Sequence, residues 1–111
     1  MDRFEKAGKS FEALCRTMAT LRAPDGCPWD REQTFETLKT YLLEETYETL
    51  DAIESGNPED HCEELGDLIL QVVFQSEIAQ ETELFDVAGV CDGIREKLIR
   101  RHPHIFADGS A

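Results

Sequence analysis

The stretch from residue 58 to residue 80 constrains the fold most, because apolar side chains surround it on almost every side. Successive residues of an α-helix turn by about 100°, and on such a wheel the apolar positions leave one narrow gap. These positions are Leu65, Leu68, Ile69, Leu70, Val72, Val73, Phe74 and Ile78. A helix that is apolar nearly all round is typical of a protein core.

A polar stripe fills the gap on this helix. Glu64 and Asp67 are spaced i, i+3, so their carboxylates lie on the same face. Gln71 and, more weakly, Gln75 continue the stripe within about 60°. The helix offers so little solvated surface that we expect Glu64 and Asp67 to face the interior.

The preceding helix, expected over residues 34–55, also places acids among apolar residues. Glu45 lies in the middle of one apolar face, and Glu44 and Glu48 flank that face. The first face is marked by Leu38, Leu42, Thr49 and Ala52, and a second face by Leu43, Tyr47 and Leu50. Two apolar faces predict that most of this helix is buried, so its glutamates are not all freely solvated.

The acids of these two helices have no basic partners nearby in the sequence. The chain of 111 residues has a net charge of −13, and residues 40–94 include fifteen acids but no lysine or arginine. Buried carboxylates that lie together repel one another unless they are protonated, paired or bound to a cation. We expect the pairs Glu45-x-x-Glu48 and Glu64-x-x-Asp67 to face a common centre. Their oxygen ligands suit Mg²⁺ or Mn²⁺, and such a cation commonly binds substrate phosphates as well.

A solvated acidic face is the ordinary alternative for any glutamate on an amphipathic helix. We expect that environment for the remaining acids of this region, including Glu59, Asp60, Glu63, Glu77 and Glu81. A di-iron bundle would need Glu-x-x-His pairs and an EF-hand would need its loop motif, and the sequence has neither.

Two more amphipathic helices are expected on either side of this pair. Apolar residues recur every three or four positions over residues 3–21, and a turn follows at residues 23–26. The sequence then continues through a predicted loop at residues 27–30. Asp86 is expected to cap a fourth helix, which ends at Pro103. We therefore expect one all-α domain of four helices over residues 1–111, with an apolar face left for a partner copy.

Basic residues gather on the fourth helix, where Lys97 and Arg101 are spaced i, i+4 beside the apolar stripe. The two side chains can grip one anionic ligand together, although bases near a helix C-terminus also compensate the helix dipole. Trp29, the only tryptophan, lies next to Asp30 in the predicted loop. The ring can stack on a nucleobase and the carboxylate can accept from an exocyclic amine. The alternative is that Trp29 plugs one end of the bundle.

The acidic charge also limits the partners that the chain can bind. It argues against non-specific binding of nucleic acid and against docking on anionic membranes, because both need lysine and arginine. The four cysteines form no C-x-x-C pair, and no long apolar run occurs, so we expect neither a secreted nor a membrane-spanning protein. We therefore expect free thiols in a cytoplasmic protein.

Four short motifs follow one another along the chain. They are G-C-P-W-D at residues 26–30, E-E-T-Y-E at 44–48, E-L-G-D at 64–67 and R-R-H-P-H-I-F at 100–106. In this order they closely resemble the MazG-type nucleoside triphosphate pyrophosphohydrolases, most of all the amino-terminal MazG domain. The resemblance implies an all-α fold, a homodimer or homotetramer, and Mg²⁺-dependent cleavage of nucleoside triphosphates to monophosphate and pyrophosphate.

Carried over by position, the resemblance also implies roles for single residues. Glu44 would adjoin the metal as a base or as a ligand of a second metal ion. In the mechanism that we expect, Glu44 or Glu45 accepts the proton of the attacking water. Lys97 and Arg101 would contact the phosphates. Four carboxylates would hold Mg²⁺: Glu45, Glu48, Glu64 and Asp67.

Two other functions are open at this point. The chain can be a catalytically silent MazG domain that dimerises or regulates a partner domain. It can also be a relative that acts on another nucleotide, such as dUTP or phosphoribosyl-ATP. Trp29 does not distinguish a purine from a pyrimidine, so the base preference is not predicted.

Overall fold

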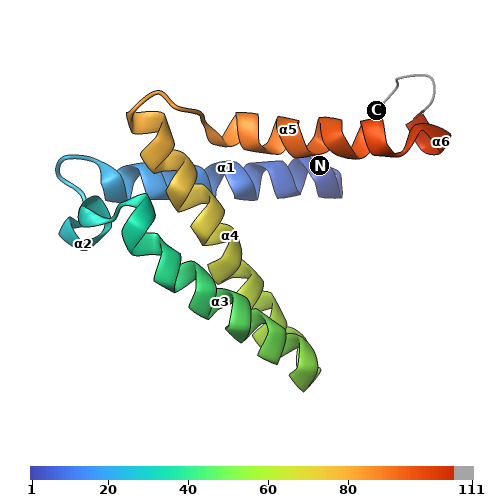
Figure 1. Ribbon diagram of the computed structural model, residues 1–111, viewed down its shortest axis with the longest axis horizontal. Coiled ribbons are helices and arrows are strands. Elements are labelled where there is room, and N and C mark those ends of the chain that lie inside the picture. The colour runs from blue at the N-terminus through green and yellow to red at the C-terminus, as the bar shows by residue number, and fades with distance from the viewer. Residues whose placement is uncertain (107–111) are drawn as a thin grey trace.

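The structure, a computed structural model, describes residues 1–106, and every regular element in this part of the chain is a helix (Figure 1). The helices are α1 Arg3–Arg22, α2 Pro28–Glu32, α3 Phe35–Ser55, α4 Pro58–Glu81, α5 Val87–Arg101 and α6 Pro103–Phe106. Residues 107–111, the end of the predicted domain, lie outside the described residues. The predicted all-α class is confirmed, and α1, α3, α4 and α5 match the four predicted helices.

Side-chain caps explain where the long helices begin and end. The Asn57 side chain accepts hydrogen bonds from two backbone amides in the first turn of α4, at 2.9 and 3.2 Å. Asp86 accepts one from the amide of Gly89 at 2.8 Å in α5. Gly56 follows α3 with φ at 72°, a left-handed conformation that favours glycine. The predicted cap at Asp86 is therefore confirmed, and Asn57 caps α4 in the same way.

The hairpin of α3 and α4 forms an arm, and α1 and α5 lie across the end of that arm where α4 finishes (Figure 1). The core lies at this crossing, where Met18, Leu38, Val73 and Phe74 are each at most 3% exposed. Leu38 belongs to the first turn of α3, whereas the two α4 residues belong to its second half. The rest of the arm projects away from the core, and it carries the predicted metal ligands.

Two short helices, α2 and α6, were not predicted from the sequence. The loop predicted over residues 27–30 is wrong in part, because α2 begins at Pro28. A proline suits the first turn of a helix, where an amide donor is not needed. Five residues are too few to show a helical period, so the sequence pattern could not reveal α2. Pro103 ends α5 as predicted, but it also starts α6.

The expectation that α3 is mostly buried is wrong for a single chain. Leu43, Tyr47 and Leu50 are 58%, 62% and 50% exposed. On α4, Leu65 and Ile69 are 47% and 40% exposed. Among the described helices, the α3 backbone lies close only to that of α4, and the exposed residues of the second apolar face have no helix packed over them. An exposed apolar surface of this kind is typical of an interface.

The other structural expectations concern thiols and membranes. Cys15 and Cys27 are half-buried, Cys62 and Cys91 are exposed, and all four are free thiols, as predicted. Within residues 1–106, no helix has the combination of length and apolar character that crossing a membrane requires.

Gly26 lies in the turn between α1 and α2, where a side chain has no room. A Cβ atom there would lie 2.3 Å from the carbonyl oxygen of Leu21. Gly26→Ala is therefore expected to lower the free energy of unfolding by about 2 kcal/mol, because the backbone must shift. Urea unfolding followed by circular dichroism measures this change.

Gly8→Ala is the matched control in the middle of α1. A Cβ atom at Gly8 would meet nothing within 4 Å, so the variant should gain up to about 1 kcal/mol from its higher helix propensity. Equal stability of Gly26→Ala and the parent chain would contradict the close approach at the turn.

Candidate functional site

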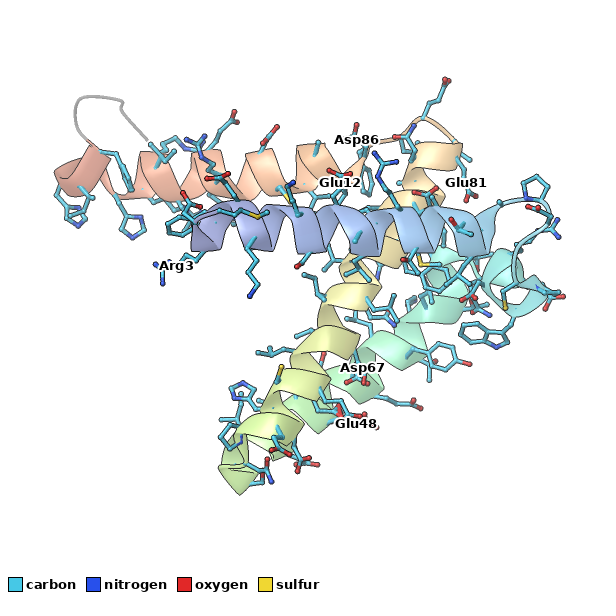
Figure 2. The ribbon with its side chains drawn as sticks, turned by 180° about the vertical axis from the view of Figure 1, so that it is seen from behind. Arg3, Glu12, Glu48, Asp67, Glu81 and Asp86 are labelled. Carbon is cyan, nitrogen blue, oxygen red and sulfur yellow. The ribbon has the colours of Figure 1, made fainter. Side chains whose placement is uncertain are left out.

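Carboxylates from the middle of α3 and the first half of α4 meet on the arm. One carboxylate oxygen from each of Glu45, Glu48 and Glu64 lies within 4.8 Å of the other two. Asp67 lies about one turn further along α4 than Glu64, near Glu48 in the view of Figure 2, and its charge acts on Glu45. Asp67 is exposed, so the expectation that it faces the interior is wrong. The structure thus brings three of the four predicted metal ligands together and places the fourth beside them. We call these four residues the carboxylate cluster.

Two members of the carboxylate cluster, Glu45 and Glu64, have a raised pKa. Burial raises the pKa of Glu45 to about 8, and the neighbouring carboxyl groups of Glu64 and Glu48 and the charge of Asp67 add to the rise. Contact with Glu45 lowers the pKa of Glu64, but burial and the Glu48 carboxyl group outweigh it, so that the pKa is raised overall. A proton or a metal cation is needed to relieve this repulsion.

Two buried oxygens of the cluster have no hydrogen-bond partner among the described residues. They are Oε2 of Glu45 and Oε2 of Glu64. A buried carboxylate oxygen without a partner costs free energy, and residues 40–94 supply no lysine or arginine to pair with it. Hard oxygen ligands at this spacing fit a divalent cation such as Mg²⁺. The residues present therefore suit the metal that the resemblance implies.

A cavity of about 250 Å³ adjoins the cluster where α2, α3 and α4 meet. Carboxylates form one side of it, from Glu44, Glu45 and Asp67. Trp29 and Asp30 line the α2 side. A site with acids at one end and an aromatic ring at the other is suited to a charged ligand with a planar group.

The Trp29 ring contacts two other rings at this cavity. It stands edge-on to Tyr41, with ring centres 5.8 Å apart, and to Phe74, with ring centres 6.5 Å apart. Phe74 is 3% exposed and belongs to the core, whereas Trp29 is 50% exposed. One edge of Trp29 is thus fixed against the core while the rest stays accessible, unlike a ring that plugs a bundle.

The predicted phosphate-binding bases lie elsewhere in the chain. Lys97 and Arg101 belong to α5, which packs against α4 and α6 but not against α3. Neither residue lines the cavity. The turn after α4 sends α5 across the core and away from the arm (Figure 1). The expectation that one chain brings these bases to the carboxylates is therefore not met.

One cavity residue, Tyr41, was missed from the sequence, and another, Gln71, was assigned no role. Tyr41 lies about one turn before Glu44 and Glu45, so its place on the same face was a usable signal. Gln71 appeared only as part of the polar stripe. It is 7% exposed, and its Oε1 atom is buried without a hydrogen-bond partner. That oxygen is available to a bound ligand or water.

Comparison with known proteins gives a consistent set of relatives. Residues 33–106 match the family described as the MazG nucleotide pyrophosphohydrolase domain. Over 104 residues the chain is 52% identical to the nucleoside triphosphate pyrophosphohydrolase/pyrophosphatase MazG of Thermotoga maritima. Over 102 residues it is 54% identical to the nucleoside triphosphate pyrophosphohydrolase of Escherichia coli K12. It is also 48% identical over 98 residues to the uncharacterized protein YabN of Bacillus subtilis.

These matches cover most of the chain but only part of each relative. They span 94%, 91% and 88% of the chain, in the order just given. The same matches span 41%, 39% and 20% of the relatives. The similarity therefore concerns one region of longer proteins.

Proposed function

Because the chain belongs to the MazG nucleotide pyrophosphohydrolase domain family, we propose that it hydrolyses nucleoside triphosphates to monophosphate and pyrophosphate. The observation that carries this proposal is the group of three carboxylate oxygens within 4.8 Å, next to a cavity with an aromatic side. The names of the Thermotoga maritima and Escherichia coli relatives support the same reaction. The activity suits nucleotide-pool housekeeping in the cytoplasm.

The carboxylate cluster is proposed to hold the metal for this reaction. Mg²⁺, or Mn²⁺ in its place, supplies charge neutralisation for the phosphates and makes water more acidic. Glu44 or Glu45 accepts the proton of the attacking water, since both line the cavity beside the cluster. The cluster members that would bind the metal are Glu45, Glu48, Glu64 and Asp67.

The α2 side of the cavity is proposed to bind the nucleoside. The accessible part of the Trp29 ring can stack on a base, because every base has an aromatic face. The Asp30 carboxylate can accept a hydrogen bond from an exocyclic amine. Placed in this way, the triphosphate extends from α2 toward the carboxylate cluster.

Product analysis over a panel of nucleotides tests the proposed reaction. The chain is incubated with Mg²⁺ and each common ribo- and deoxyribonucleoside triphosphate, with dUTP and phosphoribosyl-ATP included. We expect one pyrophosphate for each monophosphate formed. Release of inorganic phosphate and a diphosphate would contradict the proposal. Turnover of dUTP or phosphoribosyl-ATP alone would select the other enzymatic alternative.

A catalytically silent domain is the second candidate. It is favoured by one observation, namely that the chain spans only 41% of its Thermotoga maritima relative, so another region of such a protein can carry the activity. A silent domain would dimerise without turning over any nucleotide of the panel. The proposed enzyme would turn over at least one of them.

A homodimer or homotetramer is proposed to complete the site. The second apolar face of the arm, which includes Leu43, Tyr47 and Leu50, is exposed and suits a second copy of the chain. Lys97 and Arg101 do not reach the cavity of their own chain, so we propose that they bind the phosphates of a substrate held by the other copy.

Mixing two inactive variants tests this shared site. Glu64→Gln lacks a cluster carboxylate and Arg101→Ala lacks a proposed phosphate contact, so each alone should be inactive. A mixed dimer contains one site in which both residues are intact. Unfolding the two variants together and refolding them should therefore restore activity to about a quarter of an equal amount of parent.

Sedimentation supplies the structural control for this mixing experiment. The parent and both variants should sediment as dimers or tetramers at micromolar concentration. A monomer at every concentration, or a mixture as inactive as its components, would contradict the shared site.

A further inference from the structure

Arg22, in the last turn of α1, is a charged residue whose side chain is largely covered by other parts of the protein. Its side chain is 9% exposed, although arginine usually lies at the surface. Nε and Nη2 donate to the two carboxylate oxygens of Glu81 at 2.9 and 2.5 Å. Nη1 is turned the other way, toward α2. The guanidinium group therefore joins three helices.

The Nη1 atom of Arg22 donates to three backbone carbonyls at the end of α2. The acceptors are the oxygens of Asp30 at 2.7 Å, Arg31 at 3.1 Å and Gln33 at 2.9 Å. A helix leaves its last carbonyls without partners inside the helix, and a cation there also matches the helix dipole. Arg22 thus acts as a C-terminal cap supplied by another element.

This cap matters because few polar side-chain contacts hold α2, although the Trp29 ring also packs on Tyr41 and Phe74. A helix of five residues is not stable by itself. Among the described helices, the backbone of α2 lies close only to that of α1. Gln33 also links α2 to α3. Its Nε2 donates to the Trp29 carbonyl at 3.0 Å, and its Oε1 accepts from the Thr37 hydroxyl at 2.8 Å. Arg22 and Gln33 thus hold the backbone of α2 at Trp29 and Asp30, while Tyr41 and Phe74 hold one edge of the Trp29 ring.

We propose that Arg22 is a positioning residue for the nucleoside end of the cavity. By capping α2 it holds the Trp29 ring and the Asp30 carboxylate opposite the carboxylate cluster. The inference rests on the proposed function, because Trp29 and Asp30 are assigned to the nucleoside there. Arg22 makes no described contact with Glu45, Glu48 or Glu64, so it acts on substrate binding and not on the metal.

Arg22→Lys tests the proposal. Lysine keeps the charge but cannot donate hydrogen bonds to Glu81 and to three carbonyls at the same time. Trp29 is the only tryptophan, so its fluorescence reports the position of α2 directly. In Arg22→Lys we expect acrylamide to quench Trp29 more strongly than in the parent. The KM for nucleotide should rise about tenfold, while kcat changes less than about twofold. Arg16→Lys, at an exposed arginine of the same helix, should leave all three values unchanged.

Glu81→Gln separates positioning from general stability. It removes the charged partner of Arg22 but leaves the guanidinium free to cap α2. We expect a less stable protein with parental quenching of Trp29 and parental KM. If Arg22→Lys does not fold, Glu81→Gln still tests whether the ion pair positions α2. A rise in quenching and KM in Glu81→Gln would show that the ion pair, not the cap, positions α2.

Two further results would overturn the inference. One is parental quenching of Trp29 in folded Arg22→Lys, and the other is a loss of kcat with unchanged KM. The quenching measurement needs no turnover, so it can fail or succeed independently of the proposed reaction. If Arg22→Lys alters Trp29 in a chain that hydrolyses nothing, the proposed function fails and the positioning of α2 stands.

Discussion

Replacing Glu64 by Gln is expected to reduce Mg²⁺-dependent pyrophosphate release about a thousandfold or more, since the bound metal contributes several kcal/mol to catalysis. Gln has the size of Glu but no charge. The variant keeps the α4 helix and replaces one of three carboxylates, whose oxygens lie within 4.8 Å of one another, by a neutral amide. Asp67→Asn should have a similar effect, because Asp67 adjoins the same ligands. Initial rates of pyrophosphate release at saturating Mg²⁺ measure both variants.

Glu63→Gln is the matched control for this experiment. Glu63 precedes Glu64 on α4, is exposed, and lies outside the carboxylate cluster. Glu63→Gln makes the same change in net charge as Glu64→Gln. Because Glu63 is exposed and outside the cluster, activity should stay within about twofold of the parent. Full activity in Glu64→Gln, or an equal loss in Glu63→Gln, would remove the metal assignment.

Replacing Glu45 by Gln should have opposite effects on activity and on stability. Without a divalent cation, the folded chain holds the Glu45 proton up to a pKa of about 8. An unfolded chain releases it near the ordinary value for glutamate, about 4.3. Folding therefore becomes less favourable as the pH rises between these values, and the whole penalty is present above the folded pKa. A neutral amide at this position carries no such penalty, so Glu45→Gln should be inactive yet more stable at alkaline pH.

Urea unfolding in the presence of a chelator measures this effect at about pH 5 and about pH 9. At the higher pH the variant should exceed the parent by about 1–2 kcal/mol, after allowance for solvent screening. At the lower pH the difference should be small. Adding Mg²⁺ at high pH should stabilise the parent and not the variant, because the cation replaces the proton. If the free energy of unfolding changes with pH in the same way in parent and variant, charge repulsion at Glu45 does not destabilise the folded chain, and the prediction is contradicted.

Much of the fold could be predicted because its signals are local. The caps at Asn57 and Asp86 and the left-handed Gly56 mark helix ends through their own side chains or backbone. The short helix α2 could not be predicted in this way. Its last carbonyls accept hydrogen bonds from Arg22, which lies six residues before it in sequence and meets it only in the folded chain.

The candidate site likewise has a part that local sequence predicts and a part that depends on the tertiary structure. The i, i+3 spacing of Glu64 and Asp67 fixes their common face before any tertiary structure exists. The bases on α5 are different, because the direction of that helix depends on the turn after α4 and on what packs beside it. The i, i+4 spacing of Lys97 and Arg101 predicts that they act together. It does not predict which chain they face.

The exposed apolar face of the arm shows another limit of the sequence pattern. Periodicity predicted that residues such as Leu43 and Tyr47 are buried, but it does not say whether the same chain or another copy covers them. Within one chain these two residues are 58% and 62% exposed. The pattern is therefore consistent with burial in the proposed assembly, which the sedimentation experiment tests.

Calorimetric titration of Mg²⁺ tests the metal site most directly, with a nonhydrolysable nucleoside triphosphate present to occupy the cavity. The parent chain should bind Mg²⁺ at millimolar concentration or below, and Glu64→Gln should show no comparable binding while Glu63→Gln binds like the parent. No heat of binding in the parent, or the same titration curve for the parent and Glu64→Gln, would contradict a carboxylate cluster that holds the catalytic metal.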